Sequence, residues 1–183
     1  IYNIVSVVRQ AVPKEHTVSV KMRLGFDDTS LAIANAQAIA DAGADSLVIH
    51  ARTKVDGYKP PAYWDWIAKI KQYVDIPIVA NGEIWNNHDA LNCQRQSQCE
   101  NIMLGRGALA MPNLAQVIKN HKAHMPWEQV KGLLVRYSGY ELFGDKGKYY
   151  PNRVKQWLGY LSRQYPEAEA LFMRIRALKS ADE

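Results

Sequence analysis

One short stretch of the sequence combines an apolar run with residues that can hold an anion. At residues 100–109 the run Ile102-Met103-Leu104 leads directly into Gly105, Arg106 and Gly107. Glycine lets a backbone approach another group closely, and arginine offers a planar, charged fork. The pattern indicates an anion held at the end of a strand. An ordinary turn with a solvated arginine is the alternative interpretation.

Three earlier stretches also place polar residues in or directly after an apolar run, namely Lys21, His50 and the triplet Asn81-Gly82-Glu83. A lysine within a buried strand is costly unless it is paired or meets an anionic ligand, so Lys21 indicates a binding role. His50 holds the equivalent position one unit later, although a lone histidine can also belong to the core or its rim. Glu83 can alternatively cap a following helix.

The elements that must position these residues alternate along the first two thirds of the chain. Apolar runs predict strands at 17–25, 45–53, 76–84 and 100–109, and helical spacing predicts helices at 1–16, 29–44, 64–75 and 86–96. The short links between them imply parallel strands with right-handed crossovers. Because the apolar runs are continuous, we expect the strands to be buried on both faces.

Four such units form either half of an eight-stranded barrel or one side of a doubly wound sheet. The polar residues favour the barrel, because the carboxyl ends of its strands converge on one mouth where active sites lie. A flavodoxin-type sheet would more often carry a phosphate loop after its first strand, and no GxGxxG or GxxxxGK occurs here. We predict an α/β fold in which residues 1–118 form the C-terminal half of a TIM (β/α)8 barrel.

The remaining residues, 119–183, are predicted to form a small all-α helical bundle. Apolar residues recur at three- and four-residue steps in 127–142 and 153–165, with a loop at 143–152 between them. We interpret Trp157, Leu158 and Leu161 as core residues of this bundle.

The positive charge of the chain is concentrated in this tail. Residues 1–118 carry eleven basic and eleven acidic side chains, whereas residues 119–183 carry twelve and seven, which accounts for the whole net charge of +5. The asymmetry indicates a structural or catalytic part joined to a basic part that meets a polyanion. A solvated helical surface with surplus lysines is the alternative.

Several function classes are disfavoured by the composition. No apolar run approaches the roughly 20 residues of a membrane span, and residues 1–16 do not have the pattern of a signal peptide. Cys93 and Cys99 fit no common zinc spacing, so we expect free thiols, no metal, no membrane partner and a cytoplasmic location; a redox pair is the alternative. The chain lacks an initiator methionine, so we expect it to begin within a longer protein.

Four motifs, in this order and at these separations, resemble the tRNA-dihydrouridine synthases: VSVKMRLG, VIHARTKVDGY, IPIVANGEIW and IMLGRGAL. In the tail, MPNL, MPW, YPNRVKQWLGYL and LFMRIR are similar to the bacterial C-type subgroup, which modifies uridine 16 in the D-loop of tRNA. The resemblance covers residues 1 to about 180. It implies a flavoenzyme on a TIM barrel with a C-terminal helical domain.

The resemblance also implies roles for individual residues. The residues expected to hold FMN are Lys21, His50, Asn81, Gly82, Glu83, Gly105 and Arg106, with Lys21 against the N1/O2 edge of the flavin ring. The residues expected to contact tRNA are Tyr58, Arg153, Lys155, Tyr160 and Arg176. An aromatic residue among basic ones suits unstacked RNA.

The implied reaction is reduction of uridine to 5,6-dihydrouridine, in which NADPH reduces FMN, a hydride reaches C6 of the uracil and a cysteine protonates C5. The family carries that cysteine in an Asn-Cys-Gly-Cys-Pro stretch, which this chain lacks. Neither Cys93 nor Cys99 lies in such a setting, so we assign no catalytic residue here and expect the cysteine upstream of Ile1. We therefore expect this chain alone to bind FMN poorly and to be inactive.

Two other functions remain open on the sequence. One is an FMN-dependent barrel oxidoreductase that acts on a small molecule, similar to dihydroorotate dehydrogenase, which would not need a basic helical tail. The other is a non-catalytic module in which the tail binds RNA and the half barrel is a remnant.

Overall fold

The computed structural model describes residues 1–141 and 149–180, and its backbone forms two compact units. The first unit contains Ile1–Ile84 and His88–Gly105, and the second contains Trp85–Asn87 together with the chain from Arg106 onward. The expected domain boundary after residue 118 falls inside the second unit. The segment directly before that boundary therefore groups with the tail. Of the predicted loop at 143–152, residues 143–148 lie outside the described residues, and residues 150–152 are helical, which corrects the end of the predicted loop.

The first unit is built around a parallel four-stranded sheet with the order β1-β2-β3-β4. The strands are β1 (Ser19–Arg23), β2 (Ser46–His50), β3 (Ile78–Asn81) and β4 (Ile102–Met103). The predicted strands and their parallel pairing are confirmed, although each strand is shorter than its apolar run. Pairing stops at one row across the sheet, formed by Arg23, His50, Asn81 and Met103.

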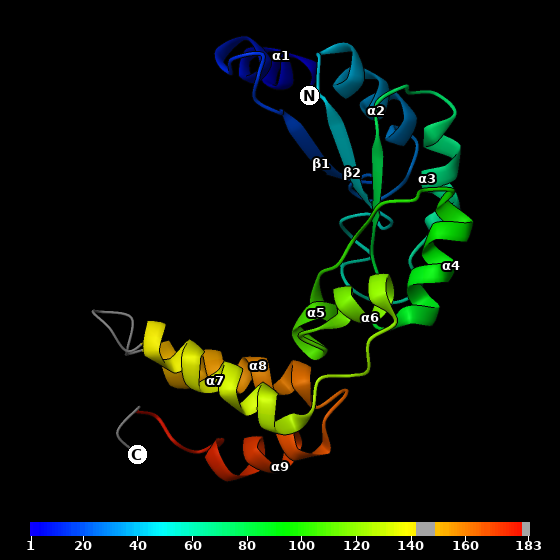
Figure 1. Cartoon of the computed structure of the whole chain (residues 1–183). Helices are drawn as coiled ribbons and strands as arrows, with labels where there is room; N and C mark the ends of the chain where they lie inside the picture. The colour runs from blue at the N-terminus through cyan, green and yellow to red at the C-terminus, as the bar shows by residue number, and fades with distance from the viewer. Residues whose placement is uncertain (142–148, 181–183) are drawn as a thin grey trace. The chain divides into compact units, whose positions relative to one another are not determined.

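Three helices cover one face of this sheet: α2 (Ala32–Asp41), α3 (Trp64–Lys71) and α4 (Asn87–Ser97) (Figure 1). A further helix, α1 (Tyr2–Ala11), precedes the first strand. Helix α2 buries Ala32, Ala36 and Ile39, which lie on one face because they are four and three residues apart. After α2, Gly43 adopts a φ of +88°, which few other residues tolerate.

The two faces of the sheet differ in burial, and this corrects the expectation that every strand is buried on both faces. Strand β2 is buried from Leu47 to His50, but β1 and β3 alternate. On β3, Ile78 and Ala80 are buried beside the helices while Val79 and Asn81 are half-buried. The strands alternate because α2, α3 and α4 lie on one side only (Figure 1).

The second unit is helical among its described residues. Its helices are α5 (Arg106–Ala110), α6 (Leu114–Asn120), α7 (Trp127–Glu141), α8 (Tyr150–Leu161) and α9 (Pro166–Ile175). The core is a cluster of buried side chains from α7, α8, α9 and the link between the last two: Val130, Leu134, Val154, Leu158, Leu161, Tyr165 and Ala168. Leu158 and Leu161 are fully buried, and Trp157 packs against the cluster, as predicted. In the described part of the chain, no helix has the length and apolar character needed to cross a bilayer.

Candidate functional site

The predicted ligand residues of the first three strands lie on one face of the sheet. Arg23, His50 and Asn81 occupy the last paired row, and Lys21 lies two residues before Arg23 on the same strand. Residues two apart in a strand share a face. This face is opposite to the one that carries the fully buried Leu47, Ile49 and Ala80. The structure therefore brings Lys21, His50 and Asn81 to the face away from α2, α3 and α4.

Lys21 is exposed at the middle of β1, which corrects the expectation of a lysine within a buried strand. Desolvation by the surrounding protein, and then the positive charge of Arg23, lower the pKa of the Lys21 ammonium from its usual value. Desolvation and the charge of Arg23 both make the charged form of Lys21 less favourable. An anionic group beside Lys21 would offset the repulsion from Arg23 and raise the pKa again. The strand therefore places two cations side by side, in an arrangement that favours a negatively charged ligand.

His50 is buried and forms part of a packed cluster at the end of β2. Its ring lies 6.2 Å from the ring of Tyr58, and the guanidinium carbon of Arg23 lies 5.4 Å from the same tyrosine ring. Gly82 packs against His50 so closely that a Cβ at Gly82 would lie 3.1 Å from the histidine Cδ2. Gly82 also has a φ of +127°, so the backbone conformation favours glycine here and a side chain would crowd His50.

The turn after β3 is fixed by two hydrogen bonds. The Asn81 amide donates from Nδ2 to the carbonyl oxygen of Met103 at 2.8 Å. The Trp64 indole donates from Nε1 to the carbonyl oxygen of Gly82 at 2.9 Å. One of the two Nδ2 hydrogens of Asn81 is therefore used within the sheet, and the second hydrogen and the amide oxygen are the atoms suited to a ligand.

Arg52 stands out at the end of its strand in the sequence but was not predicted to be a ligand residue, and the structure makes it a component of the site. Its side chain is completely buried, and Nη2 lies 2.5 Å from Oε2 of Glu83. Its Nε donates to the carbonyl oxygen of Pro61 at 3.0 Å. Among the described residues, Nη1 of Arg52 has no hydrogen-bond partner. Glu83 itself has a left-handed φ of +54°, so this ion pair holds a strained position.

The anion-binding turn predicted at the end of the fourth strand is divided between the two units. Gly105 ends the first unit, and a Cβ built on it would meet nothing within 4 Å. Arg106 begins helix α5 of the second unit. There its guanidinium carbon lies 5.1 Å from the ring centre of Trp85, and that of Arg163 lies 4.1 Å from the same ring. The phosphate role of Arg106 stays a prediction.

The five residues predicted to contact RNA lie in three different parts of the structure. Arg153 and Tyr160 line a common cavity on α8. Lys155 lines a neighbouring cavity with Arg153, and its Nζ donates to the carbonyl oxygen of Leu178 at 2.9 Å. Arg176 directly follows α9 and lines neither cavity, and the exposed Tyr58 belongs to the first unit. The structure therefore gathers three of the five predicted RNA residues on α8.

Comparison with known proteins decides the family. A model of the family described as dihydrouridine synthase (Dus) matches residues 1–182. The chain belongs to the dihydrouridine synthase family. It is 51% identical over 183 residues to the tRNA-dihydrouridine(16) synthase of Shewanella oneidensis, and 46% and 41% identical to the proteins of that name from Vibrio cholerae and Haemophilus influenzae.

The Dus chain spans a little under 60% of the length of these relatives. The alignments include the whole of this chain. They include only 58%, 57% and 59% of the lengths of the three relatives, respectively. Among solved structures, a nitroalkane oxidase from Streptomyces ansochromogenes superimposes with a TM-score of 0.40 and 20% identity. That match covers 60% of this chain and 31% of the oxidase.

The two cysteines of this Dus chain are poorly suited to act as acids or nucleophiles. Cys93 and Cys99 are free and buried. Burial, and then the neighbouring Cys99, raise the pKa of the Cys93 thiol to about 12. Burial also raises the pKa of Cys99. A buried, protonated thiol is inert, which is consistent with assigning neither cysteine a catalytic role.

We predict that both thiols resist modification while the chain is folded. At pH 8 a chromogenic disulfide reagent should react with neither cysteine in buffer and with both in 6 M urea. Because the folded pKa of Cys93 lies above its unfolded value, its contribution to stability is complete below about pH 8.5 and is lost as the pH rises toward 12. Rapid labelling of either thiol in the native chain would contradict this picture.

Proposed function

We propose that this chain acts as the C-terminal part of a cytoplasmic enzyme that reduces uridine to 5,6-dihydrouridine in the D-loop of tRNA, at position 16. The observation that carries the proposal is the common face shared by Lys21, His50 and Asn81 at the carboxyl ends of parallel strands. In a TIM barrel these ends form the mouth that holds the ligand. The half barrel would be completed by strands outside this chain.

The proposed cofactor is FMN, with NADPH as the reductant. Two observations at this end of the sheet fit a bound group: the buried Nη1 of Arg52 lacks a partner among the described residues, and the space beside Gly105 is open. The donor set also fits, because a flavin presents carbonyl oxygens, ring nitrogens and a phosphate. When bound, FMN would supply the hydride chemistry that links NADPH to the uracil ring.

The residues of this chain would bind and orient that cofactor. Lys21 would place a cation against the pyrimidine edge of the flavin, and His50 would contact the ring or its phosphate. Asn81, Gly82 and Glu83 would hold the ribityl and phosphate region, where the ion pair with Arg52 fixes the turn. Gly105 and Arg106 would complete the phosphate site. The cysteine that protonates C5 would lie outside this chain.

The helical unit would bind the tRNA. The basic excess of the chain lies entirely in residues 119–183, and neutralising RNA phosphates makes such binding sensitive to salt. Arg153, Lys155, Tyr160 and Arg176 would contribute from this unit, and Tyr58 from the first. A flavoenzyme for small substrates would have no use for this basic surface, which favours tRNA over a substrate of the dihydroorotate type.

The decisive experiment uses a longer protein that includes the proposed upstream part of the barrel. We expect the longer protein, purified with FMN, to form dihydrouridine at position 16 of an unmodified tRNA transcript when NADPH is supplied. Substituting Lys21→Ala should reduce the rate of dihydrouridine formation by at least about tenfold through loss of a group that orients the cofactor. The 183-residue chain alone should show neither flavin absorbance after purification nor activity.

Each alternative function predicts a different result in that assay. NADPH oxidation that is stimulated by a small free pyrimidine, whose C5–C6 double bond accepts the hydride, but not by tRNA would support the small-molecule oxidoreductase. Tight tRNA binding without dihydrouridine formation in the longer, flavin-loaded protein would support the non-catalytic module. Stoichiometric flavin retained by the 183-residue chain would contradict our assignment of an incomplete cofactor site.

A further inference from the structure

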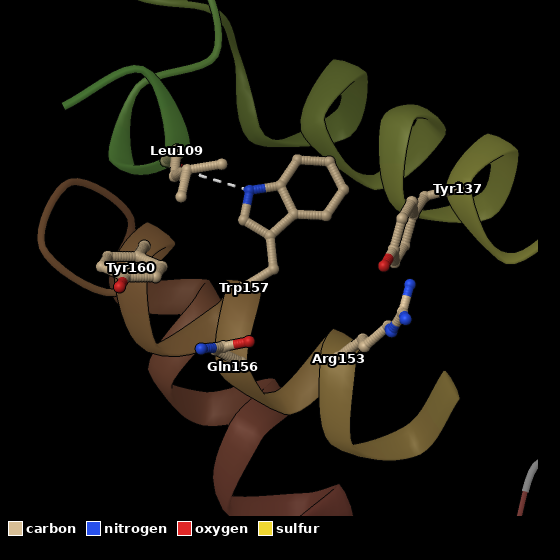
Figure 2. Close-up of a pocket in the computed structure, with 6 residues that line it drawn as sticks. All are labelled: Leu109, Tyr137, Arg153, Gln156, Trp157 and Tyr160. Atoms are coloured by element: carbon tan, nitrogen blue, oxygen red, sulfur yellow. Dashed lines mark hydrogen bonds between the residues drawn. The ribbon is translucent and has the colours of Figure 1, made fainter. Parts of the chain in front are cut away.

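A cavity of about 540 Å³ lies on one face of helix α8, within the second unit. Its lining residues are Leu109, Tyr137, Arg153, Gln156, Trp157 and Tyr160 (Figure 2). Four of them come from α8 and lie on one face of the helix, because they are three, four and seven residues after the first. The volume falls within the range of about 300–1,000 Å³ that is usual for small-ligand sites.

The apolar wall of this cavity is held in place before any ligand binds. The indole Nε1 of Trp157 donates to the carbonyl oxygen of Leu109 at 3.0 Å. The ring of Tyr137 meets the indole edge-on, with 5.4 Å between ring centres and 83° between planes. Figure 2 shows Tyr137 and Tyr160 on opposite sides of Trp157. The wall therefore contains three aromatic side chains, of which Trp157 and Tyr137 are fixed by these contacts.

The polar residues of the cavity lie together on the turns of α8 beneath this wall. Gln156 offers an amide that both donates and accepts hydrogen bonds, and Arg153 offers a guanidinium, as Figure 2 shows. A second cavity of about 640 Å³ shares both residues and adds Tyr149, Asn152, Lys155 and Phe172. Arg153 and Gln156 thus lie between two adjoining hollows, each of which also has an aromatic side chain.

We propose that the 540 Å³ cavity holds one unstacked RNA nucleotide, with its base against the aromatic wall and its edge hydrogen-bonded by Gln156. Arg153 then binds the phosphate that leads to the neighbouring nucleotide in the second cavity. This inference rests on the proposed function, and it adds a specific nucleotide site to a surface otherwise assigned only by charge. Unstacked bases are recognised by this combination of stacking and edge hydrogen bonds.

The chemistry of the cavity favours a nucleotide over a purely apolar ligand or a peptide. An apolar ligand would make no hydrogen bond to the amide of Gln156 and no ionic contact with the guanidinium of Arg153. An acidic peptide could contact Arg153 but would make no use of three aromatic side chains. A base joined to a phosphate uses both, and the basic excess of residues 119–183 attracts such a polyanion.

The test compares two RNA probes that differ only in their bases. One is hexauridylate, and the other is a ribose-phosphate backbone of the same length without bases. We expect the 183-residue chain to bind hexauridylate about tenfold more tightly than the abasic backbone, since stacking of even one base on a protein aromatic ring strengthens binding by about this factor. Tyr160→Ala should reduce this preference at least about threefold, and Tyr160→Phe should retain most of it.

Matched controls come from the same helical unit. Tyr140, which is 80% exposed, and Gln129 lie on α7 outside both cavities. Tyr140→Ala and Gln129→Leu should therefore leave the preference for bases unchanged, whereas Gln156→Leu should reduce it. Arg153→Ala should weaken both probes and reduce the salt slope by about one phosphate contact. Circular dichroism should show that each variant keeps its helices.

The proposal is overturned if the wild-type chain binds both probes equally, or if Gln156→Leu and Gln129→Leu have the same effect. Displacement of hexauridylate by an acidic peptide at equal affinity would instead assign the cavity to a peptide. The outcome is separate from that of the proposed function. A longer protein that forms dihydrouridine while this chain shows no preference for bases would retain the activity and reject only the nucleotide site.

Discussion

Replacing Glu83 with alanine is expected to lower the free energy of unfolding by about 3–5 kcal/mol, because it leaves a buried guanidinium without its carboxylate. Arg52 is completely buried, and Nη2 lies 2.5 Å from the Glu83 carboxylate. Nη1 of Arg52 already lacks a hydrogen-bond partner among the described residues. In this described part of the chain, no second acceptor beside Nη1 can therefore replace the lost carboxylate of Glu83. Urea denaturation followed by circular dichroism measures the loss.

Two further variants test whether the loss of stability comes from the Arg52–Glu83 ion pair or from the loss of any carboxylate. Glu83→Gln keeps an acceptor oxygen and should cost less than Glu83→Ala. Glu15→Ala removes an exposed acid after α1 and should change stability by less than about 0.5 kcal/mol. If Glu83→Ala and Glu15→Ala proved equally mild, the Arg52–Glu83 pair would have no role in holding the turn after β3.

Leu158→Ala is the second substitution for which we expect a large effect, about 2–5 kcal/mol of lost stability. Leu158 is fully buried in the cluster formed by α7, α8 and α9, and truncating it leaves a cavity there. The free energy of unfolding, measured in urea with helical ellipticity as the signal, should fall accordingly. Reduced tRNA affinity should accompany this loss, because Arg153 and Tyr160 lie on the same helix.

Val135 provides the matched control for Leu158. It lies on α7, is 70% exposed and points away from the buried cluster, so Val135→Ala should change stability by less than about 0.5 kcal/mol. A Leu158→Ala chain as stable as Val135→Ala would show that the helical core is not packed as described.

The arrangement of strands and helices in the first unit was predictable because each element carries a local signal. Continuous apolar runs marked β1, β2 and β3, and alanines at helical spacing marked α2. The lengths were less predictable. A strand ends where its neighbours stop pairing, and the row from Arg23 to Met103 is set by all four strands together. No single run contains that information.

Burial was predicted less well, for two physical reasons. The sequence of β3 does not show that helices cover only one face of the sheet, so Val79 was expected to be buried. Arg52, in contrast to Val79, is more buried than its sequence context suggests. An arginine after a strand is usually solvated, and the burial of Arg52 depends on Glu83, 31 residues later. The only sequence signal was its position two residues after His50, which does not distinguish a buried ion pair from a surface charge.

The candidate site was predictable where the chemistry of a residue conflicts with its surroundings. Lys21 within an apolar run was selected for that reason, and the structure places it on the same face of the sheet as His50 and Asn81. Arg153, Lys155 and Tyr160 were selected through family resemblance. The cavity that Arg153 and Tyr160 share also needs Leu109 and Tyr137, which come from two other helices. Spacing along α8 does not reveal them.

The grouping of Trp85–Asn87 with the helical unit has a practical consequence for dissecting this chain by truncation. An expression clone that begins at Arg106 would delete Trp85, the aromatic plate against which both Arg106 and Arg163 lie. The truncated chain would then keep the guanidinium groups of Arg106 and Arg163 without the Trp85 indole that both of them contact. Binding data from such a clone would describe an altered surface. Point substitutions within the 183-residue chain are therefore the sounder way to assign binding roles to the two units.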